Sequence, residues 1–354
     1  MVPLVDLRRR HRRYEAGFVD ATRRVLDSGR ILLGDELAGL EGELGPHLNG
    51  PSAATCEIVG VSSGAAALEL VMAAVGIGPG DEVIVPAFTA VPTASAVCAV
   101  GAVPVPVDVD PDTAALDHEA VAAAVTARTA AIVVVHLYGR PAPMTELLQL
   151  GLPVIEDAAQ AHGALEGVCG VAAAYSFYPT KNLGGIGDGG AVVTPDADLA
   201  ASVRRRRAHG ADRQYVHLDV SQNYRMSELE AAWLRLQAPM LGQDNERRRE
   251  IAGRYRDTAP KLRWQADHDR HVVHQCVVRV DDREQFRAAL AERGVETGVH
   301  YPLALTQQPA YEHLAVHRCR ESEAWAAECV SLPCFPELTD DEVARVAGAL
   351  ADLA

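Results

Sequence analysis

Short apolar runs alternate with helical segments through the first two thirds of the chain. The runs cover residues 82–86, 103–107, 131–136 and 153–155, and the helical segments between them cover 91–100, 117–125 and 144–150. The strands are continuous apolar runs without a polar alternation, so both faces of the sheet should be covered by helices. This pattern predicts an α/β protein with a mostly parallel sheet, whose ligands lie beyond the carboxyl ends of the strands.

The same periodicities place further elements at both ends of this region. An amphipathic helix is expected over residues 10–30 and a second helix over about 35–47, and a strand and an arginine-rich helix follow Gly190. The polar segment 209–225 is long and irregular for a compact domain, and such loops are often functional. The remaining expected elements are helices at 227–236, 245–255, 282–293 and 340–352 and a strand at 271–280. We therefore expect a large domain over residues 1–245 and a small C-terminal domain over residues 246–354.

Composition excludes several classes of protein. The net charge of -15 argues against a general nucleic-acid binder, although a local positive site could still hold a small anion. The chain begins without the apolar stretch of a signal peptide, and its apolar runs are too short to span a membrane. The seven cysteines show neither a CxxC pair nor zinc-type spacing. We expect a cytoplasmic protein with reduced thiols and no metal site.

The stretch from Val171 to Gly190 carries the most chemistry. An apolar run, expected to be a buried strand, leads through Ser176 to Lys181, and five glycines follow within nine residues. An amine held just beyond a buried strand suits a lysine that forms a Schiff base with a carbonyl compound. A glycine-rich loop with an ordinary surface lysine is the alternative, and this stretch alone does not separate the two.

Two other positions are expected near the same crevice. Ser63 precedes a strongly helical segment that starts at Gly64, so it is a natural N-cap, and open N–H groups at such a helix start can bind an anion. Asp157 ends an apolar strand, where a buried carboxylate needs a cationic partner. A protonated pyridine nitrogen would be one such partner. A plain capped helix and a structural salt bridge are the alternative interpretations.

With these residues in hand, the chain resembles the fold type I aminotransferases that use pyridoxal 5′-phosphate (PLP), and specifically the DegT/StrS group of sugar aminotransferases. Five motifs carry the resemblance in the family's order: SSGAAAL at 62–68, VIEDAAQAHGA at 154–164, SFYPTKNLGGIGDGG at 176–190, QNYRMSELEAA at 222–232 and HYP at 300–302. The resemblance implies a large domain with a mostly parallel seven-stranded sheet flanked by helices, followed by a smaller α+β domain.

The resemblance also implies roles for individual residues. Lys181 would hold PLP covalently and move protons, and Asp157 would keep the pyridine nitrogen protonated. The implied cofactor-binding set is Ser63, Gly64, Ala65, Ala90, Asp157, Gln160, Ser176, Lys181 and Asn223. The implied substrate-binding set is Tyr178, Arg225, His300 and Tyr301. Because the matching asparagine reaches the cofactor phosphate of the neighbouring subunit, Asn223 implies a homodimer with a shared active site.

Two positions depart from the family pattern. Ala65 stands where a threonine is usual, so one hydroxyl contact to the phosphate is missing. Ala90 stands where an aromatic ring commonly covers the cofactor. Either something smaller covers the cofactor ring, or another residue such as Phe88 takes that place.

The resemblance implies transfer of an amino group from L-glutamate to a nucleotide-linked keto-sugar. The wording of the lysine motif favours a dTDP-3-keto-6-deoxyhexose. Two alternatives stay open: an enzyme acting on a carbocyclic keto substrate, of keto-cyclitol or aminoshikimate type, and a regulatory relative without catalysis.

Overall fold

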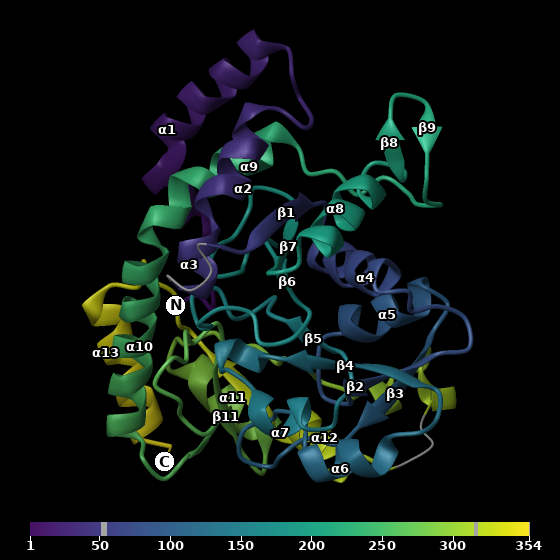
Figure 1. The fold of residues 1–354 in the computed structure, drawn as a ribbon. Helices are drawn as coiled ribbons and strands as arrows, with labels where there is room; N and C mark the ends of the chain where they lie inside the picture. Colours follow the sequence, from purple (N-terminus) through teal and green to yellow (C-terminus); the bar gives the residue numbers. More distant parts are fainter. Residues whose placement is uncertain (51–54, 315–317, 354) are drawn as a thin grey trace.

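The computed structural model describes residues 1–50, 55–314 and 318–353. Its centre is a mixed seven-stranded sheet with the order β1-β7-β6-β5-β4-β2-β3 (Figure 1). Strand β7 is antiparallel to both of its neighbours, and the other neighbouring strands are parallel. The strands are β1 (Glu57–Val61), β2 (Glu82–Pro86), β3 (Val103–Val107), β4 (Thr129–Val135), β5 (Val154–Asp157), β6 (Ala172–Ser176) and β7 (Gly190–Thr194). The predicted seven-stranded, mostly parallel sheet is confirmed.

Helices pack on both faces of this sheet, which explains why its strands are apolar on both sides. One face carries α4 (Gly64–Ala74), α5 (Pro92–Ala99) and α8 (Ala197–Arg206) in one continuous apolar cluster. The other face is covered by two groups of helices. These are α6 (His118–Ala124) and α7 (Met144–Leu148) over β2 to β5, and α2 (Asp35–Glu43), α3 (Gly45–Asn49) and α9 (Glu228–Gln237) over β1, β7 and β6.

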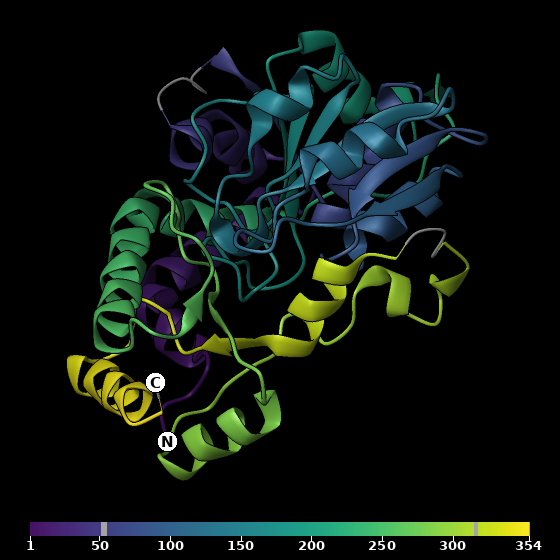
Figure 2. The ribbon, with the colours of Figure 1, turned by 90° about the horizontal axis from the view of Figure 1, so that it is seen from below.

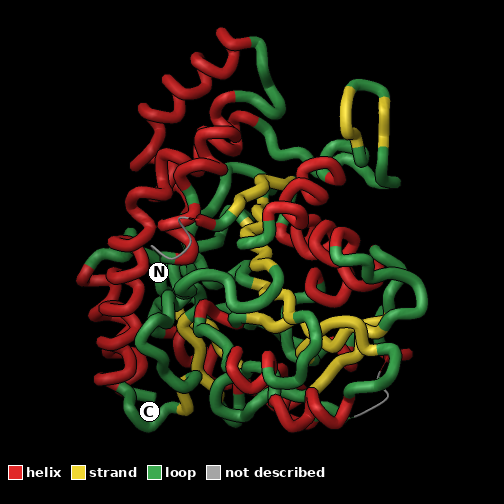
Figure 3. Tube along the Cα trace, viewed as in Figure 1, coloured by secondary structure: helices red, strands yellow, loops and turns green. Residues whose placement is uncertain are grey.

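The first helix, α1 (Leu7–Ser28), crosses α9 and extends beyond the sheet (Figures 1 and 3). Asp6 begins it, because its side chain accepts the N–H of Arg8, and Gly29 ends it in the left-handed conformation. Three aromatic rings of α1 contact the buried Trp233 of α9 edge-to-face. This contact fixes the helix against the large sheet.

The C-terminal part forms a second layer, seen below the large sheet in Figure 2. The helix α10 (Leu241–Thr258) leads into it and packs on α13 (Asp340–Ala351). Its antiparallel sheet has the order β10-β11-β12. The remaining elements are β10 (Arg263–Trp264), β11 (Cys276–Arg279), β12 (Cys329–Leu332), α11 (Arg283–Glu292) and α12 (Arg320–Glu328). Whether the chain divides at residue 245 stays a prediction.

Two segments differ from the sequence-based expectation. The strand expected over 271–280 is limited to β11, because residues 272 and 274 donate their N–H groups to the turn at Tyr138–Gly139 instead of to a neighbouring strand. The apolar alternation there reflects burial against that turn. The polar segment 209–225 contains the small hairpin of β8 (Ala211–Arg213) and β9 (Val216–His217), which stands away from the sheet in Figure 1.

The N-terminal segment lies against the C-terminal layer. Val2 forms a parallel bridge with Val295, and the N–H of Leu4 donates to Glu296. Arg9 makes a two-pronged ion pair with Glu342, with both N–O distances 2.7 Å. Residues at opposite ends of the sequence therefore share one interface.

None of the described helices is long and apolar enough to cross a membrane. Over the same described ranges, no group of three or more His, Cys, Asp or Glu side chains is arranged to hold a metal ion.

Candidate active site

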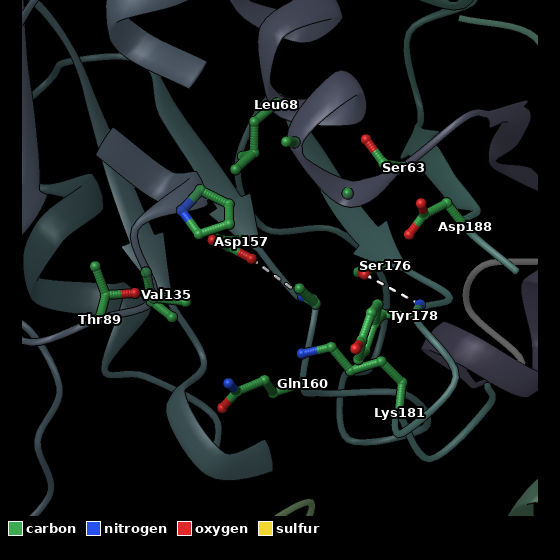
Figure 4. A pocket seen from close by; sticks show the side chains of 15 residues that line it. Ser63, Leu68, Thr89, Val135, Asp157, Gln160, Ser176, Tyr178, Lys181 and Asp188 are labelled. Atoms are coloured by element: carbon green, nitrogen blue, oxygen red, sulfur yellow. Dashed lines mark hydrogen bonds between the residues drawn. The ribbon is translucent and has the colours of Figure 1, made fainter. Parts of the chain in front are cut away.

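A cavity of about 260 Å³ lies at the carboxyl ends of β4, β5 and β6 and at the N-terminus of α4 (Figure 4). Nine of the thirteen sequence-predicted site residues line it: Ser63, Gly64, Ala65, Ala90, Asp157, Gln160, Ser176, Tyr178 and Lys181. The expected crevice at the strand ends is therefore present, and it brings together residues that are up to 118 positions apart (181 − 63).

Lys181 lies in the turn after β6, with its side chain extending into the cavity toward Gln160 and Asp157 (Figure 4). Its backbone N–H closes the turn by donating to Tyr178 O at 2.8 Å. Burial lowers the pKa of Lys181 to about 8, and the nearby Asp157 carboxylate opposes that shift. A larger fraction of this amine than of an ordinary lysine is therefore unprotonated near neutral pH, as a nucleophile or proton acceptor requires.

Helix α1 supports the turn that carries Lys181 through the side chain of Arg10. Nη1 of Arg10 donates to Pro179 O at 2.9 Å and to Lys181 O at 3.0 Å. Arg10 is only 5% exposed and forms no ion pair among the described residues. Gly184 allows this approach, because a Cβ there would come 2.5 Å from Arg10 Nη1.

Asp157 ends β5 and is buried. Burial raises the pKa of its carboxyl group. The Thr93 hydroxyl, the Ala159 N–H and the charge of Lys181 act in the opposite direction and favour the ionised form. Thr93 Oγ1 donates to Asp157 Oδ2 at 2.8 Å, and Ala159 N donates to Oδ1 at 3.2 Å. The site thus holds a buried carboxylate that a cationic ligand group would stabilise.

The N-terminus of α4 forms the opposite end of the cavity. Ser63 begins the helix, and its side chain accepts the N–H of Ala66 at 3.1 Å. The N–H groups of Gly64 and Ala65 have no hydrogen-bond partner within the described part of the chain. Gly64 faces Ser176 so closely that a Cβ would lie 2.6 Å from the serine Cβ. A hydroxyl and open N–H groups at a helix N-terminus make an anion cradle.

Gln160 links the cavity to the C-terminal layer. Its Oε1 accepts the N–H of Tyr138 at 2.5 Å, and its Nε2 donates to the Tyr301 hydroxyl at 3.0 Å. His300 precedes Tyr301 through a cis peptide bond, but it lies outside the main cavity. Tyr301 is therefore placed beside the predicted site through Gln160, whereas His300 lines a separate, smaller cavity.

Asn223 and Arg225 do not reach this chain's own cavity. Asn223 is exposed, and its Oδ1 accepts Nε of Arg225 at 2.8 Å. This position agrees with a role toward a neighbouring subunit, but the shared site and the homodimer remain predictions.

The sequence left two possibilities for the group that would cover the cofactor ring at the Ala90 position: a smaller residue or Phe88. The structure contradicts the second of these. Phe88 does not line the cavity but is fully buried in the apolar core, where its ring stacks on Trp325 with ring centroids 5.9 Å apart. The cavity wall at this point is made by Ala90 and Pro92. The adjacent apolar core retains the Phe88 ring, so the cavity wall at the Ala90 position consists of small residues.

Sequence reasoning missed three residues that support the site. Thr93 and Arg10 lie far in sequence from the groups they bind, and a lone threonine or an arginine in a basic helix gives no pattern that could have identified them. Glu230 binds the glycine-rich loop after Lys181, with Oε2 accepting the N–H of Gly187 at 2.9 Å. Its position within the QNYRMSELEAA motif was the only available signal.

Comparison with known proteins agrees with this geometry. Residues 13–351 match the model of the DegT/DnrJ/EryC1/StrS aminotransferase family. The dTDP-3-amino-3,4,6-trideoxy-alpha-D-glucose transaminase of Streptomyces venezuelae is 41% identical, covering 100% of this chain and 96% of that protein. The UDP-N-acetyl-3-dehydro-alpha-D-glucosamine 3-aminotransferase of Acidithiobacillus ferrooxidans is 40% identical, covering 98% and 96%. A pleiotropic regulatory protein of Geobacillus stearothermophilus is 38% identical, covering 99% and 98%.

Solved structures lead to the same family. DesV of S. venezuelae, in complex with a ketimine intermediate, has a TM-score of 0.94 and 40% identity, covering 99% of this chain and 98% of that one. NtdA of Bacillus subtilis, with the cofactor PMP bound, has a TM-score of 0.92 and 29% identity, covering 99% and 85%. The chain therefore belongs to the DegT/DnrJ/EryC1/StrS aminotransferase family.

Proposed function

We propose that this protein is a PLP-dependent aminotransferase that moves an amino group from L-glutamate to a nucleotide-linked keto-sugar. The main observation behind the proposal is that Lys181 and Asp157 line the same cavity. An amine with a lowered pKa faces a buried carboxylate, and an anion cradle lies at the other end. These are the three groups that a phosphorylated pyridine aldehyde requires.

The residues present fit PLP. Gly64 leaves open the space that a Cβ would close against Ser176, and the free N–H groups of Gly64 and Ala65 would hold the phosphate. These N–H groups offset the hydroxyl that Ala65 lacks. Asp157 would pair with the ring nitrogen, and Gln160 would lie beside the ring. When bound, PLP supplies an aldehyde for amines and a ring that accepts electrons from the bond that breaks.

The chain's own residues then perform the proton chemistry. Lys181 can take up a proton at the donor's α-carbon and release it again, because its lowered pKa leaves part of the amine unprotonated. Asp157 remains ionised more readily because Thr93 and Ala159 donate hydrogen bonds to it. Arg10 restrains the backbone on both sides of Thr180, so the amine stays at a fixed place during both transfers.

The acceptor is proposed to be a dTDP-3-keto-6-deoxyhexose. Two observations support this choice over other keto-sugars. The S. venezuelae relative named for a dTDP-3-amino sugar is among the most similar proteins, and the lysine motif of this chain has the wording of that branch. The similarly close UDP-sugar relative makes the nucleotide itself the point to test.

The active site is proposed to be completed by a second copy of the chain. Asn223 and Arg225 lie on an exposed segment next to the β8–β9 hairpin, outside their own cavity. A homodimer would bring this pair to the partner's cradle, where an amide and a guanidinium suit a phosphate or a carboxylate.

The cofactor assignment can be tested on a chain with only two lysines, Lys181 and Lys261. The full-length protein is incubated with PLP, reduced with borohydride, digested and analysed by mass spectrometry. We expect the added mass on the Lys181 peptide, while the exposed Lys261 serves as an internal control for unspecific labelling. Equal labelling of both lysines, or an unchanged result in Lys181→Ala, would contradict the assignment.

The substrate assignment needs a second experiment. The holoenzyme is converted with L-glutamate, followed by absorption spectroscopy, and then mixed with matched dTDP- and UDP-linked 3-keto-sugars, a dTDP-4-keto-sugar and a keto-cyclitol. We expect the dTDP-linked 3-keto-sugar to restore the initial spectrum fastest. A faster return with the cyclitol would replace the proposed acceptor by a carbocyclic one.

A further inference from the structure

A second, smaller cavity lies beside the Lys181 turn, where the N-terminal segment meets the C-terminal layer. Its volume is about 70 Å³. The polar side chains that line it are Thr180, Arg248, His274, Gln275 and His300, and the remaining lining is mostly apolar. No aspartate or glutamate is among the described lining residues. The cavity thus has hydrogen-bond donors and positive charge but no anion.

Arg248 is the unusual group in this cavity. It lies on α10, is 3% exposed, and forms no ion pair within the described ranges. Nη1 donates to Cys334 O and, at 3.5 Å, to Val273 O, whereas Nε is buried without a partner. A buried guanidinium without a counter-ion costs several kcal/mol, and the open N–H groups can make further charge-assisted bonds. The structure therefore leaves a built place for an anion.

His274 and His300 also line this cavity and can each add a hydrogen-bond donor to it. Nδ1 of His274 lies 3.2 Å from Asn182 Oδ1, and Nδ1 of His300 lies 2.8 Å from Ser331 Oγ. Neither Nε2 has a partner among the described residues, so each can turn to a ligand. Burial lowers the pKa of both imidazoles, and the charge of Lys181 lowers them further. An anion would relieve this repulsion.

We infer that this cavity binds the carboxylate of the amino donor, and of the 2-oxo acid formed from it, with Arg248 as the charged partner and Thr180 and His300 as neutral donors. Its volume suits one carboxylate group and excludes a phosphorylated sugar. Thr180 directly precedes Lys181, so this cavity lies on the same turn whose lysine side chain lines the larger cavity. The inference rests on the proposed function for the identity of the donor.

The site can be tested without catalysis. Thermal unfolding of the full-length protein, with and without PLP, is followed while formate replaces chloride at constant ionic strength. We expect formate to raise the unfolding temperature of the wild type, and Arg248→Lys and Thr180→Val to reduce this rise. Arg247→Lys is the matched control, because Arg247 is the neighbouring residue on α10 and pairs with Asp340 on the surface.

A kinetic measurement then tests the occupant. In Arg248→Lys and Thr180→Val we expect the KM for L-glutamate to rise about tenfold, as loss of a charge-assisted hydrogen bond predicts. The KM for the keto-sugar should stay within about twofold. Thr180→Val keeps the test valid if Arg248→Lys does not fold, because its side chain keeps its shape.

The outcomes separate this inference from the function on which it rests. No response of the wild type to formate would overturn the anion site. A response to formate with an unchanged glutamate KM in the variants would overturn the donor carboxylate as its occupant. A wild type that responds to formate but transfers no amino group from glutamate would instead refute the proposed function.

Discussion

The Thr93 hydroxyl offers a direct test of how the site keeps Asp157 ionised. Thr93 is fully buried and donates to Asp157 Oδ2 at 2.8 Å. Thr93→Val replaces the hydroxyl by a methyl group of nearly the same size, so the main change is one hydrogen bond to a carboxylate. We expect the variant to bind PLP less tightly and to transfer amino groups more slowly.

The magnitude follows from the kind of bond that is lost. Hydrogen bonds to charged groups contribute about 1.5–3 kcal/mol, which corresponds to a factor of about 10 to 150. Burial already raises the pKa of Asp157, and Thr93 opposes that shift. Removing Thr93 therefore raises the pKa further, so the ionised form is lost at a higher pH as the solution is acidified.

The assay is the pH dependence of the glutamate half-reaction, measured by cofactor absorption in the holoenzyme. We expect the acid limb of the Thr93→Val profile to move to higher pH. Urea unfolding of the cofactor-free chain should show the stability loss above the raised pKa of Asp157 and less of it as the pH falls through that pKa, because only the ionised carboxylate loses a bond. Thr89→Val is the control, since Thr89 Oγ1 lies 3.1 Å from Thr93 Oγ1 and does not bind Asp157. An unmoved acid limb in Thr93→Val would refute the reasoning.

Three further predictions concern the support of the Lys181 loop. Gly185→Ala should lower the free energy of unfolding by about 1–3 kcal/mol, because its Cβ would overlap Glu230 Oε1. Gly242→Ala, with nothing within 4 Å in α10, should raise it by about 0.5–1 kcal/mol. Burial raises the pKa of Glu230 to about 7 from its ordinary 4.5, so the native state keeps a proton that the unfolded chain releases, and stability falls as pH rises through this window. Glu230→Gln cannot lose this proton, so its stability should not fall in this way. Between pH 4 and pH 8 the variant should gain up to about 3 kcal/mol of unfolding free energy relative to the wild type, measured by urea unfolding. A stability difference that does not change with pH would contradict the raised pKa of Glu230. Arg10→Met leaves two partly buried carbonyl groups without a donor, so we expect a loss of about 2–4 kcal/mol and a fall in kcat larger than any rise in the glutamate KM. Arg12→Met on the exposed face should leave both kinetic constants unchanged.

The sequence was sufficient to predict the sheet and the residues at its strand ends. Buried parallel strands are continuous apolar runs, and their carboxyl ends meet at one edge, so Asp157, Ser176 and Lys181 could be placed together before any coordinates were known. The short strands near the C-terminus were harder, because β10 and β12 have only two and four residues and their burial depends on α10 and α13.

The supporting contacts of the site could not be predicted in the same way. Arg10 binds Lys181 O across 171 positions, and Thr93 binds Asp157 across 64. Neither contact follows from a local periodicity, since each depends on how two elements pack in three dimensions. The Ala90 position shows the same limit: only the packing around Trp325 decides that Phe88 turns away from the cavity.

The interface between the two ends of the chain also constrains how the protein is made. Leu4 bonds to a residue 292 positions later, and Arg9 to one 333 positions later. At about 5–20 residues per second, a ribosome needs between about 15 and 70 s to deliver Glu342 after Arg9 has been synthesised. During this time the start of α1 has no C-terminal surface on which to dock, although the Lys181 turn that Arg10 supports is made about halfway through the interval. The turn that carries Lys181 therefore gains its full support only after the residues around Glu342 have been synthesised.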